Sequence, residues 1–225
     1  MKYYAIIVAG GSGNRMQSEV AKQFLLLDGK PILMHTLDSF RKCVLNPELL
    51  LVLNIQQHAY WAALCKQYNF NVPHKIIAGG EQRYHSVKNG LDTIKEECVV
   101  IVHDAVRPLV TSSLIERAFS EAKEKGNAIA GIHPTDSIRR IIEGKKSESI
   151  SRDSIVLIQT PQAFQSDVLK KAYLQPFKYE FTDDASVVES DGVEINVIEG
   201  ERSNIKITFP EDMEIANLLL KRKGS

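Results

Sequence analysis

Short apolar runs rich in β-branched residues alternate along the chain with longer stretches whose apolar residues recur every three or four positions. The short runs predict strands at 3–9, 48–55, 74–79, 98–104, 127–134, 154–160 and 193–200. The longer stretches predict helices at 31–43, 57–69, 112–126 and 211–224. Strands that alternate with helices predict an α/β fold built on a mainly parallel sheet.

Residues at the expected helix ends support these boundaries. Pro31 suits a first helical turn, and Thr111 or Ser112 can cap the helix that ends before Gly126. The segment TDDASVVES at 182–190 has the composition of a capped, acidic helix start. These signals fix the ends of helices but not their positions around the sheet.

One segment interrupts the alternation of strands and helices. Residues 137–153 hold a turn-like sequence, EGKKSES, between two short strands. A surface hairpin explains this pattern, and so does a protruding β-arm that docks on a partner, because a two-stranded arm is marginally stable alone. We therefore expect a single domain over 1–225, with 137–153 as a protruding dimerisation arm on the second interpretation.

Composition narrows the possible partners. The chain has 28 Lys and Arg against 28 Asp and Glu, so no net field attracts it to nucleic acid or to an anionic membrane. No apolar run approaches the roughly 18 residues that a membrane span needs. Cys43, Cys65 and Cys98 are widely spaced and lie in apolar runs, which suits buried thiols in a reducing compartment. We expect a cytoplasmic protein that binds neither nucleic acid nor membrane.

The first predicted strand runs into a glycine-rich segment, AGGSGNRMQSEVAKQF, at 9–24. Its glycines allow backbone N–H groups to close on an anion. Arg15 and Lys22 follow, seven residues apart; on a helix they face one side and reach a bound phosphate, or they are solvated surface residues. The dinucleotide-binding fingerprint needs a glycine where Met16 stands, and the Walker Gly-Lys-Ser/Thr is missing from this segment. The segment therefore argues against NAD and against P-loop chemistry.

The fourth predicted strand ends at Asp104, and Arg107 follows three residues later. A carboxylate at a sheet's carboxyl edge suits Mg²⁺, which takes few protein ligands and completes its shell with phosphate and water. Asp104 can equally cap a turn or a helix. The planar fork of Arg107 suits phosphate recognition. His103 alternates to the other face of the strand and is interpreted as a core histidine.

Two further groups of residues have ambiguous signals. The turn at 79–80 precedes a helix with Arg83 and Ser86; it can hold a base or ribose, or simply connect a strand to a helix. The second group lies beside the arm and at the last sheet edge, and comprises Arg152, Thr160, Gln162 and Lys206. Arg152, Thr160 and Gln162 are either a cradle for a second, phosphorylated substrate or a surface patch on a single strand, and Lys206 is otherwise an ordinary strand lysine.

In order and spacing, several segments closely resemble the 2-C-methyl-D-erythritol 4-phosphate cytidylyltransferase family of the non-mevalonate isoprenoid pathway. They are AGGSGNRM, AKQF, GGEQRYHSV, VHDAVRP, QTPQAF, TDDASVVE and NIKIT, and the likeness covers almost the whole chain. The resemblance implies a Rossmann-like nucleotidyltransferase fold and a homodimer with crossed arms. It also implies a reaction of CTP with 2-C-methyl-D-erythritol 4-phosphate, with Mg²⁺, that gives 4-diphosphocytidyl-2-C-methyl-D-erythritol and pyrophosphate.

The resemblance further implies roles for individual residues. The implied catalytic residues are Arg15 and Lys22, as transition-state stabilisers, and Arg152 and Lys206, as positioners of the attacking phosphate. The implied nucleotide-binding residues are Ala9, Gly10, Gly11, Ser12, Gly13, Gly80, Glu81, Ser86, Asp104 and Ala105, with Asp104 also on the metal. The implied polyol-phosphate contacts, some from the partner subunit, are Arg107, Asp136, Ser137 and Thr160. Ala21, Glu81 and Ser137 replace the family's usual Pro, Asp and Thr without removing a required chemical group.

Two other functions compete with this one. A ribitol 5-phosphate cytidylyltransferase shares the glycine loop and the TPQ segment, but HDAVRP and TDDAS favour the methylerythritol enzyme. A non-catalytic nucleotide-binding regulator is the alternative from another class. The intact set of Arg15, Lys22, Asp104 and Lys206 argues against it.

Overall fold

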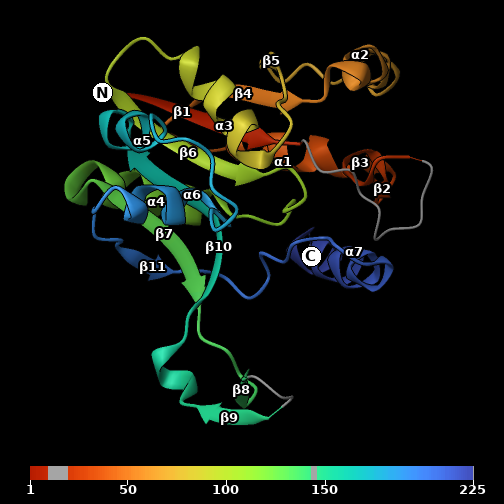
Figure 1. Ribbon diagram of the computed structural model, residues 1–225. Helices are drawn as coiled ribbons and strands as arrows, with labels where there is room; N and C mark the ends of the chain where they lie inside the picture. Colours follow the sequence, from red (N-terminus) through yellow and green to blue (C-terminus); the bar gives the residue numbers. More distant parts are fainter. Residues whose placement is uncertain (10–19, 143–145, 225) are drawn as a thin grey trace.

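A mixed seven-stranded sheet forms the centre of the computed structural model, which describes residues 1–9, 20–142 and 146–224 (Figure 1). Within these ranges the strand order is β11-β7-β10-β6-β1-β4-β5. The strands are β1 (Lys2–Val8), β4 (Glu48–Leu53), β5 (Lys75–Ala78), β6 (Cys98–Asp104), β7 (Asn127–Ile132), β10 (Leu157–Gln165) and β11 (Val197–Glu199). Only β10 runs antiparallel to its neighbours. The predicted α/β fold with a mainly parallel sheet is confirmed.

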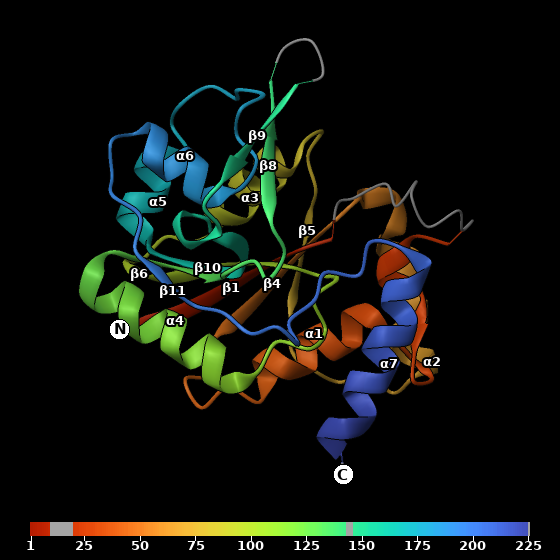
Figure 2. The ribbon, with the colours of Figure 1, turned by 90° about the horizontal axis from the view of Figure 1, so that it is seen from below.

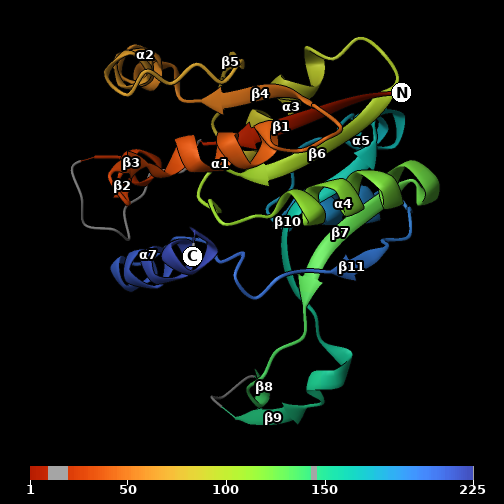
Figure 3. The same cartoon turned by 180° about the vertical axis from the view of Figure 1, so that it is seen from behind.

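Helices cover both faces of the sheet (Figures 1 and 3). One face packs against α1 (Ile32–Arg41), α2 (His58–Gln67) and α4 (Ser112–Lys125). The other packs against α3 (Arg83–Asp92), α5 (Ser166–Ala172) and α6 (Asp184–Ser190). Ala5 and Ile7 of β1 belong to the first core, and Tyr4 and Ile6 to the second, because successive side chains of a strand point to opposite faces. A strand buried on both faces explains the continuous apolar run in its sequence.

The helix ends follow the signals in the sequence. The Thr111 side chain accepts a hydrogen bond from the backbone N–H of Leu114, 3.1 Å away, so Thr111 and not Ser112 is the cap. Gly126 ends α4 with a φ of 91°, a conformation that glycine adopts without strain. Asp183 and Ser186 form a reciprocal capping box at the start of α6.

A small hairpin and the last helix flank the carboxyl ends of the central strands (Figure 2). The hairpin consists of β2 (Leu26–Leu27) and β3 (Lys30–Pro31), and the last helix is α7 (Pro210–Gly224). They share a third apolar cluster that includes Leu27, Val106 and Ala216. Two 3₁₀ turns, η2 (Lys22–Phe24) and η3 (Ile55–Gln57), complete this side. None of the helices in the described ranges is long and apolar enough to cross a membrane.

The region around residue 160 differs from its prediction. The strand predicted at 154–160 begins later, at Leu157, and continues to Gln165, while η5 (Arg152–Ser154) precedes it. The register on β7 shifts between Ile158 and Gln162, and Pro161 lies inside this irregular stretch. Proline has no backbone N–H to donate to a regular ladder, so it is tolerated at an irregular stretch such as this one, where that hydrogen bond is not required. The strand predicted at 193–200 likewise shortens to β11.

The predicted β-arm is present. Strands β8 (Ile138–Ile141) and β9 (Ser147–Ile150) pair antiparallel and form a separate two-stranded sheet. The arm leaves the ends of β7 and β10 and stands away from the central sheet (Figures 1 and 3).

Candidate active site

Four neighbouring strands end side by side and create the edge on which the site is built. The N–H of Ala105, after β6, donates to the carbonyl of Val8 at 3.0 Å. The N–H of Ala9, after β1, donates to Val52 of β4 at 2.9 Å, and Gly79, after β5, donates to Leu53 at 2.9 Å. Open α/β sheets bind ligands outside the carboxyl ends of their strands. The first residues beyond β1, β5 and β6 therefore face the expected binding position.

Asp104 lies at this edge among three cationic side chains. Its Oδ2 is 3.0 Å from Nζ of Lys206 and 3.2 Å from Nε of Arg107. Its Oδ1 is 4.0 Å from Nε of Arg83. The backbone N–H of Asp104 donates to Thr160 Oγ1 at 3.0 Å. Asp104, Arg107, Thr160 and Lys206, which the sequence placed on three different segments, thus meet at one point.

The protonation states of this cluster are set by its cations. Burial alone would raise the pKa of Asp104, but Lys206, Arg83 and Arg107 hold it well below the usual range of a carboxyl. Burial lowers the pKa of Arg107, and Asp104 opposes that shift. Burial also lowers the pKa of His103 to about 4, which agrees with its interpretation as a neutral core histidine. The site therefore presents a carboxylate with several fixed positive charges.

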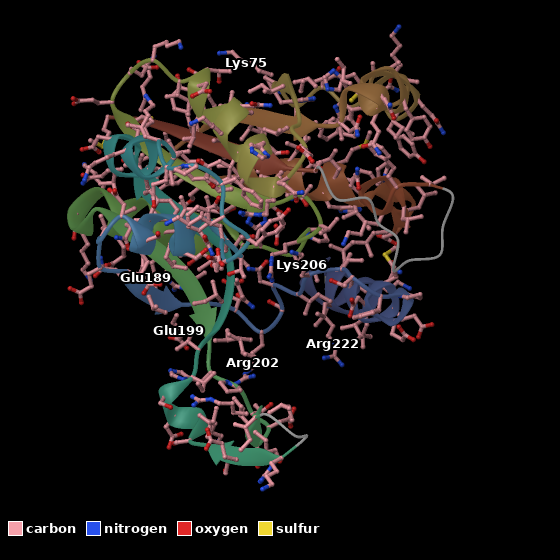
Figure 4. All side chains as sticks on the ribbon, viewed as in Figure 1. Lys75, Glu189, Glu199, Arg202, Lys206 and Arg222 are labelled. Atoms are coloured by element: carbon pink, nitrogen blue, oxygen red, sulfur yellow. The ribbon has the colours of Figure 1, made fainter. Side chains whose placement is uncertain are left out.

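A cavity of about 250 Å³ opens onto this cluster. Its lining residues come from α3, the end of β6 and the turn after it, β10, the residues before α6 and the segment before α7. They are Arg83, Asp104, Arg107, Ile158, Gln159, Thr160, Gln162, Thr182, Asp183 and Lys206. Figure 4 shows Lys206 between the sheet and α7. A cavity lined with several cations and hydroxyl groups suits a phosphorylated ligand.

Arg83 is held in the cavity wall by a buried partner. Its Nη1 and Nη2 donate to the two carboxylate oxygens of Asp184 at 3.0 and 2.5 Å. Burial would lower the pKa of Arg83, but Asp184, with a smaller contribution from Asp104, raises it above its usual value. Gln162 fixes the same helix end, because its Oε1 accepts the N–H groups of Asp184 and Ala185 at 3.1 and 3.0 Å. This arrangement joins α3, α6 and β10 on one side of the cavity.

The turn between β5 and α3 is closed by the buried hydroxyl of Ser86, which accepts the N–H of Gly80 at 3.0 Å. A Cβ at Gly80 would lie 2.4 Å from Cβ of His85, so only glycine fits this approach. Glu81 follows at an exposed bend. The turn therefore brings Gly80, Glu81 and Ser86 to the same sheet edge as Ala9 and Ala105.

The glycine-rich segment is only partly covered. Gly10, Gly11, Ser12, Gly13 and Arg15 lie outside the described residues. Lys22 begins η2, and the amide of the buried Gln23 donates to the carbonyl of Ala9 at 3.0 Å, so this turn is tied to the end of β1. The helix that was to align Arg15 with Lys22 does not reach Lys22, because Ala21 is extended with a ψ of 134°. A continuous helix through Arg15 and Lys22 is thereby excluded, and their approach to a common phosphate stays a prediction because Arg15 lies outside the described residues.

The residues of the arm lie apart from the cavity. Arg152, in η5, donates from Nη1 to the carbonyl of Thr135 at 2.7 Å. Asp136 and Ser137 are exposed in the connection that leads into β8. These three predicted residues gather at the base of the arm and do not line the cavity around Asp104.

Three buried polar residues of the site were not predicted from the sequence: Asp184, Gln159 and Asn204. Asp184 was seen only as part of an acidic helix start, although it is fully buried against Arg83. Gln159 and Asn204 are buried polar residues beside Thr160 and Arg107. No spacing or composition pattern distinguishes them, because their partners come from distant segments.

The donor set permits one kind of metal site. No group of three or more His, Cys, Asp or Glu side chains that could hold a metal ion occurs among the residues described. Asp104 is a single carboxylate whose Oδ2 lies 3.0 Å from Lys206 and 3.2 Å from Arg107, whereas its Oδ1 lies 4.0 Å from Nε of Arg83. Mg²⁺ is commonly held by one or two carboxylates together with substrate phosphates and water. Asp104 fits that mode through Oδ1.

A Rossmann-like sheet whose strand ends carry this cationic cavity defines an enzyme of the nucleotidyltransferase class. The family described as 2-C-methyl-D-erythritol 4-phosphate cytidylyltransferase matches residues 3–222. The chain belongs to this family.

Individual relatives agree over nearly the full length. The 2-C-methyl-D-erythritol 4-phosphate cytidylyltransferase of Azobacteroides pseudotrichonymphae is 48% identical over 218 residues, which cover 96% of this chain and 98% of that protein. The Bacteroides fragilis enzyme of the same name is 47% identical, with 96% and 98% covered. The crystal structure of 4-diphosphocytidyl-2C-methyl-D-erythritol synthase from Anaerococcus prevotii superposes with a TM-score of 0.83 at 28% identity, covering 98% of this chain and 96% of that one.

Proposed function

We propose that this cytidylyltransferase of isoprenoid precursor biosynthesis works as an electrostatic clamp. It joins CTP to 2-C-methyl-D-erythritol 4-phosphate and gives 4-diphosphocytidyl-2-C-methyl-D-erythritol and pyrophosphate. The observation that carries the proposal is the convergence of Arg83, Arg107 and Lys206 on Asp104 in one cavity at the carboxyl edge of the sheet. Nucleotidyl transfer needs little covalent help from the protein and much positive charge.

In this mechanism a phosphate oxygen of the polyol phosphate attacks the α-phosphorus of CTP, and the bond to pyrophosphate breaks. The attacking phosphate is already ionised, so no general base and no covalent enzyme intermediate are needed. Lys206 and Arg152 position that phosphate, while Arg15 and Lys22 neutralise charge that builds up around the α-phosphorus. Such preorganised cations act most strongly where water is excluded.

The nucleotide is assigned to the strand ends on the other side of Asp104. Ala9 and the segment Gly10, Gly11, Ser12 and Gly13 hold the triphosphate, and Gly80, Glu81, Ser86 and Ala105 hold the cytidine. Support comes from the backbone geometry, which places Ala9, Ala105 and the 79–80 turn along one edge. Asp104 would hold Mg²⁺ through Oδ1, and the ion would neutralise phosphate charge.

The acceptor is assigned to Arg107 and Thr160 in the cavity and to Asp136, Ser137 and Arg152 at the arm. Within one chain the arm residues do not line the cavity. A homodimer in which each arm reaches the partner's cavity removes this discrepancy, and the exposed Ile141 and Ile142 of the arm supply apolar surface for such contact. The free state of Cys43, Cys65 and Cys98 is consistent with the cytoplasm as its location.

The direct test is pyrophosphate release by the purified protein with CTP and Mg²⁺. We expect turnover with 2-C-methyl-D-erythritol 4-phosphate and none with ribitol 5-phosphate. Turnover with ribitol 5-phosphate alone would move the acceptor assignment to the rival enzyme. Absence of turnover with both, in a folded protein that binds CTP, would favour the regulator.

The role of the arm is tested separately by replacing 138–150 with a short glycine-rich link. We expect a folded monomer by light scattering with little turnover, because Arg152 and its neighbours then lack a partner cavity. A fully active monomer would overturn the dimer proposal and leave the assignment of the reaction intact.

A further inference from the structure

The loop that carries Lys206 has no regular secondary structure, yet it delivers an ammonium group to within 3.0 Å of Asp104. The loop follows β11 and covers 200–206. A lysine side chain is flexible, and on an irregular loop its ammonium group could take many positions. Contacts that hold the loop backbone near Lys206 are therefore needed to keep the ammonium group close to Asp104. Asn204, two residues before Lys206, is fully buried.

Asn204 connects three parts of the site. Its Nδ2 donates to the carbonyl of Thr160 at 2.8 Å. Its own carbonyl accepts from Nη1 of Arg107 at 2.8 Å. One residue thereby ties the Lys206 loop to β10 and orients the guanidinium that faces Asp104.

Gln159 strengthens the same attachment. Its amide pairs with the backbone of Glu201, donating from Nε2 to the carbonyl at 2.9 Å and accepting the N–H at 3.2 Å. Its Oε1 also lies 3.3 Å from Nδ2 of Asn204. A Cβ at Gly200 would come within 2.6 Å of that Oε1, which shows how closely loop and strand approach.

We infer that Asn204 is a positioning residue for the acceptor phosphate, acting through Lys206 and Arg107. The inference rests on the proposed function of those two cations. Asn204 itself does not line the cavity, so it influences the substrate only through its neighbours. Its Oδ1 is buried without a hydrogen-bond partner among the described residues, so replacing the amide with an apolar group of similar shape removes donor bonds alone.

Asn204→Leu is the matching variant, and Asn127→Leu is its control. Asn127 is equally buried and donates from Nδ2 to a backbone carbonyl, that of Glu194, also at 2.8 Å. It holds a different loop at the opposite end of the sheet. Each variant loses two side-chain hydrogen bonds at a buried position: Asn204 donates two, whereas Asn127 donates one and accepts the N–H of Asn196 at 2.7 Å. The control therefore reports a general destabilisation at least as large as that of Asn204→Leu.

The expected result for Asn204→Leu is a KM for the polyol phosphate raised by about tenfold, with the KM for CTP little changed. Asn127→Leu should change neither KM. The decisive measurement is a double-mutant cycle with Lys206→Ala, in which Asn204→Leu should add less than about a twofold further effect. Additive losses, or equal changes in both KM values, would overturn the inference.

Two further outcomes keep the test decisive. If Asn204→Leu does not fold, Asn204→Ser takes its place in the cycle, because a serine hydroxyl is too short to keep the bond to Thr160. If Lys206→Ala turns over both substrates like the wild type, the proposed role of Lys206 fails, and the inference fails with it. A strongly impaired Lys206→Ala with an additive Asn204 variant would overturn the inference alone.

Discussion

The two ends of the same four strands carry similar charged side chains but differ in burial and in balance. At the amino ends, Lys2 pairs with Glu96 at 2.8 Å and Lys75 with Glu48 at 3.1 Å, all four side chains well exposed. At the carboxyl ends, Asp104 is only 8% exposed and has cations on both of its oxygens. Figure 4 shows Lys75 and Lys206 in these separate places.

The balance of charge distinguishes the two ends further. Lys2 and Lys75 are matched by two glutamates, so these two pairs leave no excess of either sign. Among the ion-paired side chains at the carboxyl ends, Asp184 neutralises Arg83, and Asp104 lies between the two cations Arg107 and Lys206. Asp183 also lines the cavity, but it caps α6 and accepts a hydrogen bond from Gln162. An anion is attracted only where positive charge is left over and water is largely excluded. Both ends of the strands have ion pairs, so the number of ion pairs does not tell which end binds an anion.

Asp104→Asn should break this comparison most strongly. The variant keeps the shape of the side chain but leaves Arg107 and Lys206 without their carboxylate. Removing one partner of a buried ion pair typically costs about 3 kcal/mol, so we expect that loss in the free energy of unfolding by urea titration. Turnover should fall by about a hundredfold or more. Unchanged stability would show that the cations are solvated and that the cluster is not the buried unit described here.

Arg83→Lys should have an intermediate effect. Lysine keeps the positive charge but cannot donate to both oxygens of Asp184 from a planar fork. We expect a loss of about 1–2 kcal/mol in the free energy of unfolding. Arg41→Lys is the control, since Arg41 makes an exposed bond to Asn46 at 3.1 Å, and its stability should stay close to that of the wild type. Equal losses in both variants would mean that the bidentate pair adds nothing specific.

Lys75→Ala should have the smallest effect. Its bond to Glu48 is exposed, and such pairs contribute little in water. We expect unchanged turnover and a shift in thermal midpoint of at most about 2 °C, measured by circular dichroism. A large loss of turnover would mean that the amino ends take part in function, and it would contradict the assignment of the active site to the carboxyl ends alone.

The sequence determined the sheet well wherever strands are buried on both faces. The runs at 3–9 and 98–104 became β1 and β6 with little change, because apolar residues on both sides of a strand leave few other structures. The predicted bounds were less accurate at β10, where an antiparallel strand with Pro161 lies between parallel ones and runs from Leu157 to Gln165. That placement depends on tertiary packing, which no local pattern reports.

The residues of the site likewise fall into two groups, those that a local pattern predicts and those that only tertiary packing reveals. Asp104 and Arg107 were found because they follow a clear strand, and carboxyl ends of parallel strands gather at one edge. Asp184 and Asn204 were missed because their importance lies in partners 101 and 44 positions away, Arg83 and Thr160. A single sequence contains the residues of such pairs but not the pairing.

The arm is inserted between two strands that pair directly with each other, and this position affects how freely the length of the arm can vary. The arm lies within the connection over 133–156 that joins β7 to β10, and these two strands are hydrogen-bonded neighbours in the sheet. Closing a flexible loop costs only about 0.6 kcal/mol more for each doubling of its length. The connection can therefore lengthen or shorten at small entropic cost while the hairpin of β7 and β10 keeps its register. The stability of the sheet therefore constrains the length of the arm only weakly.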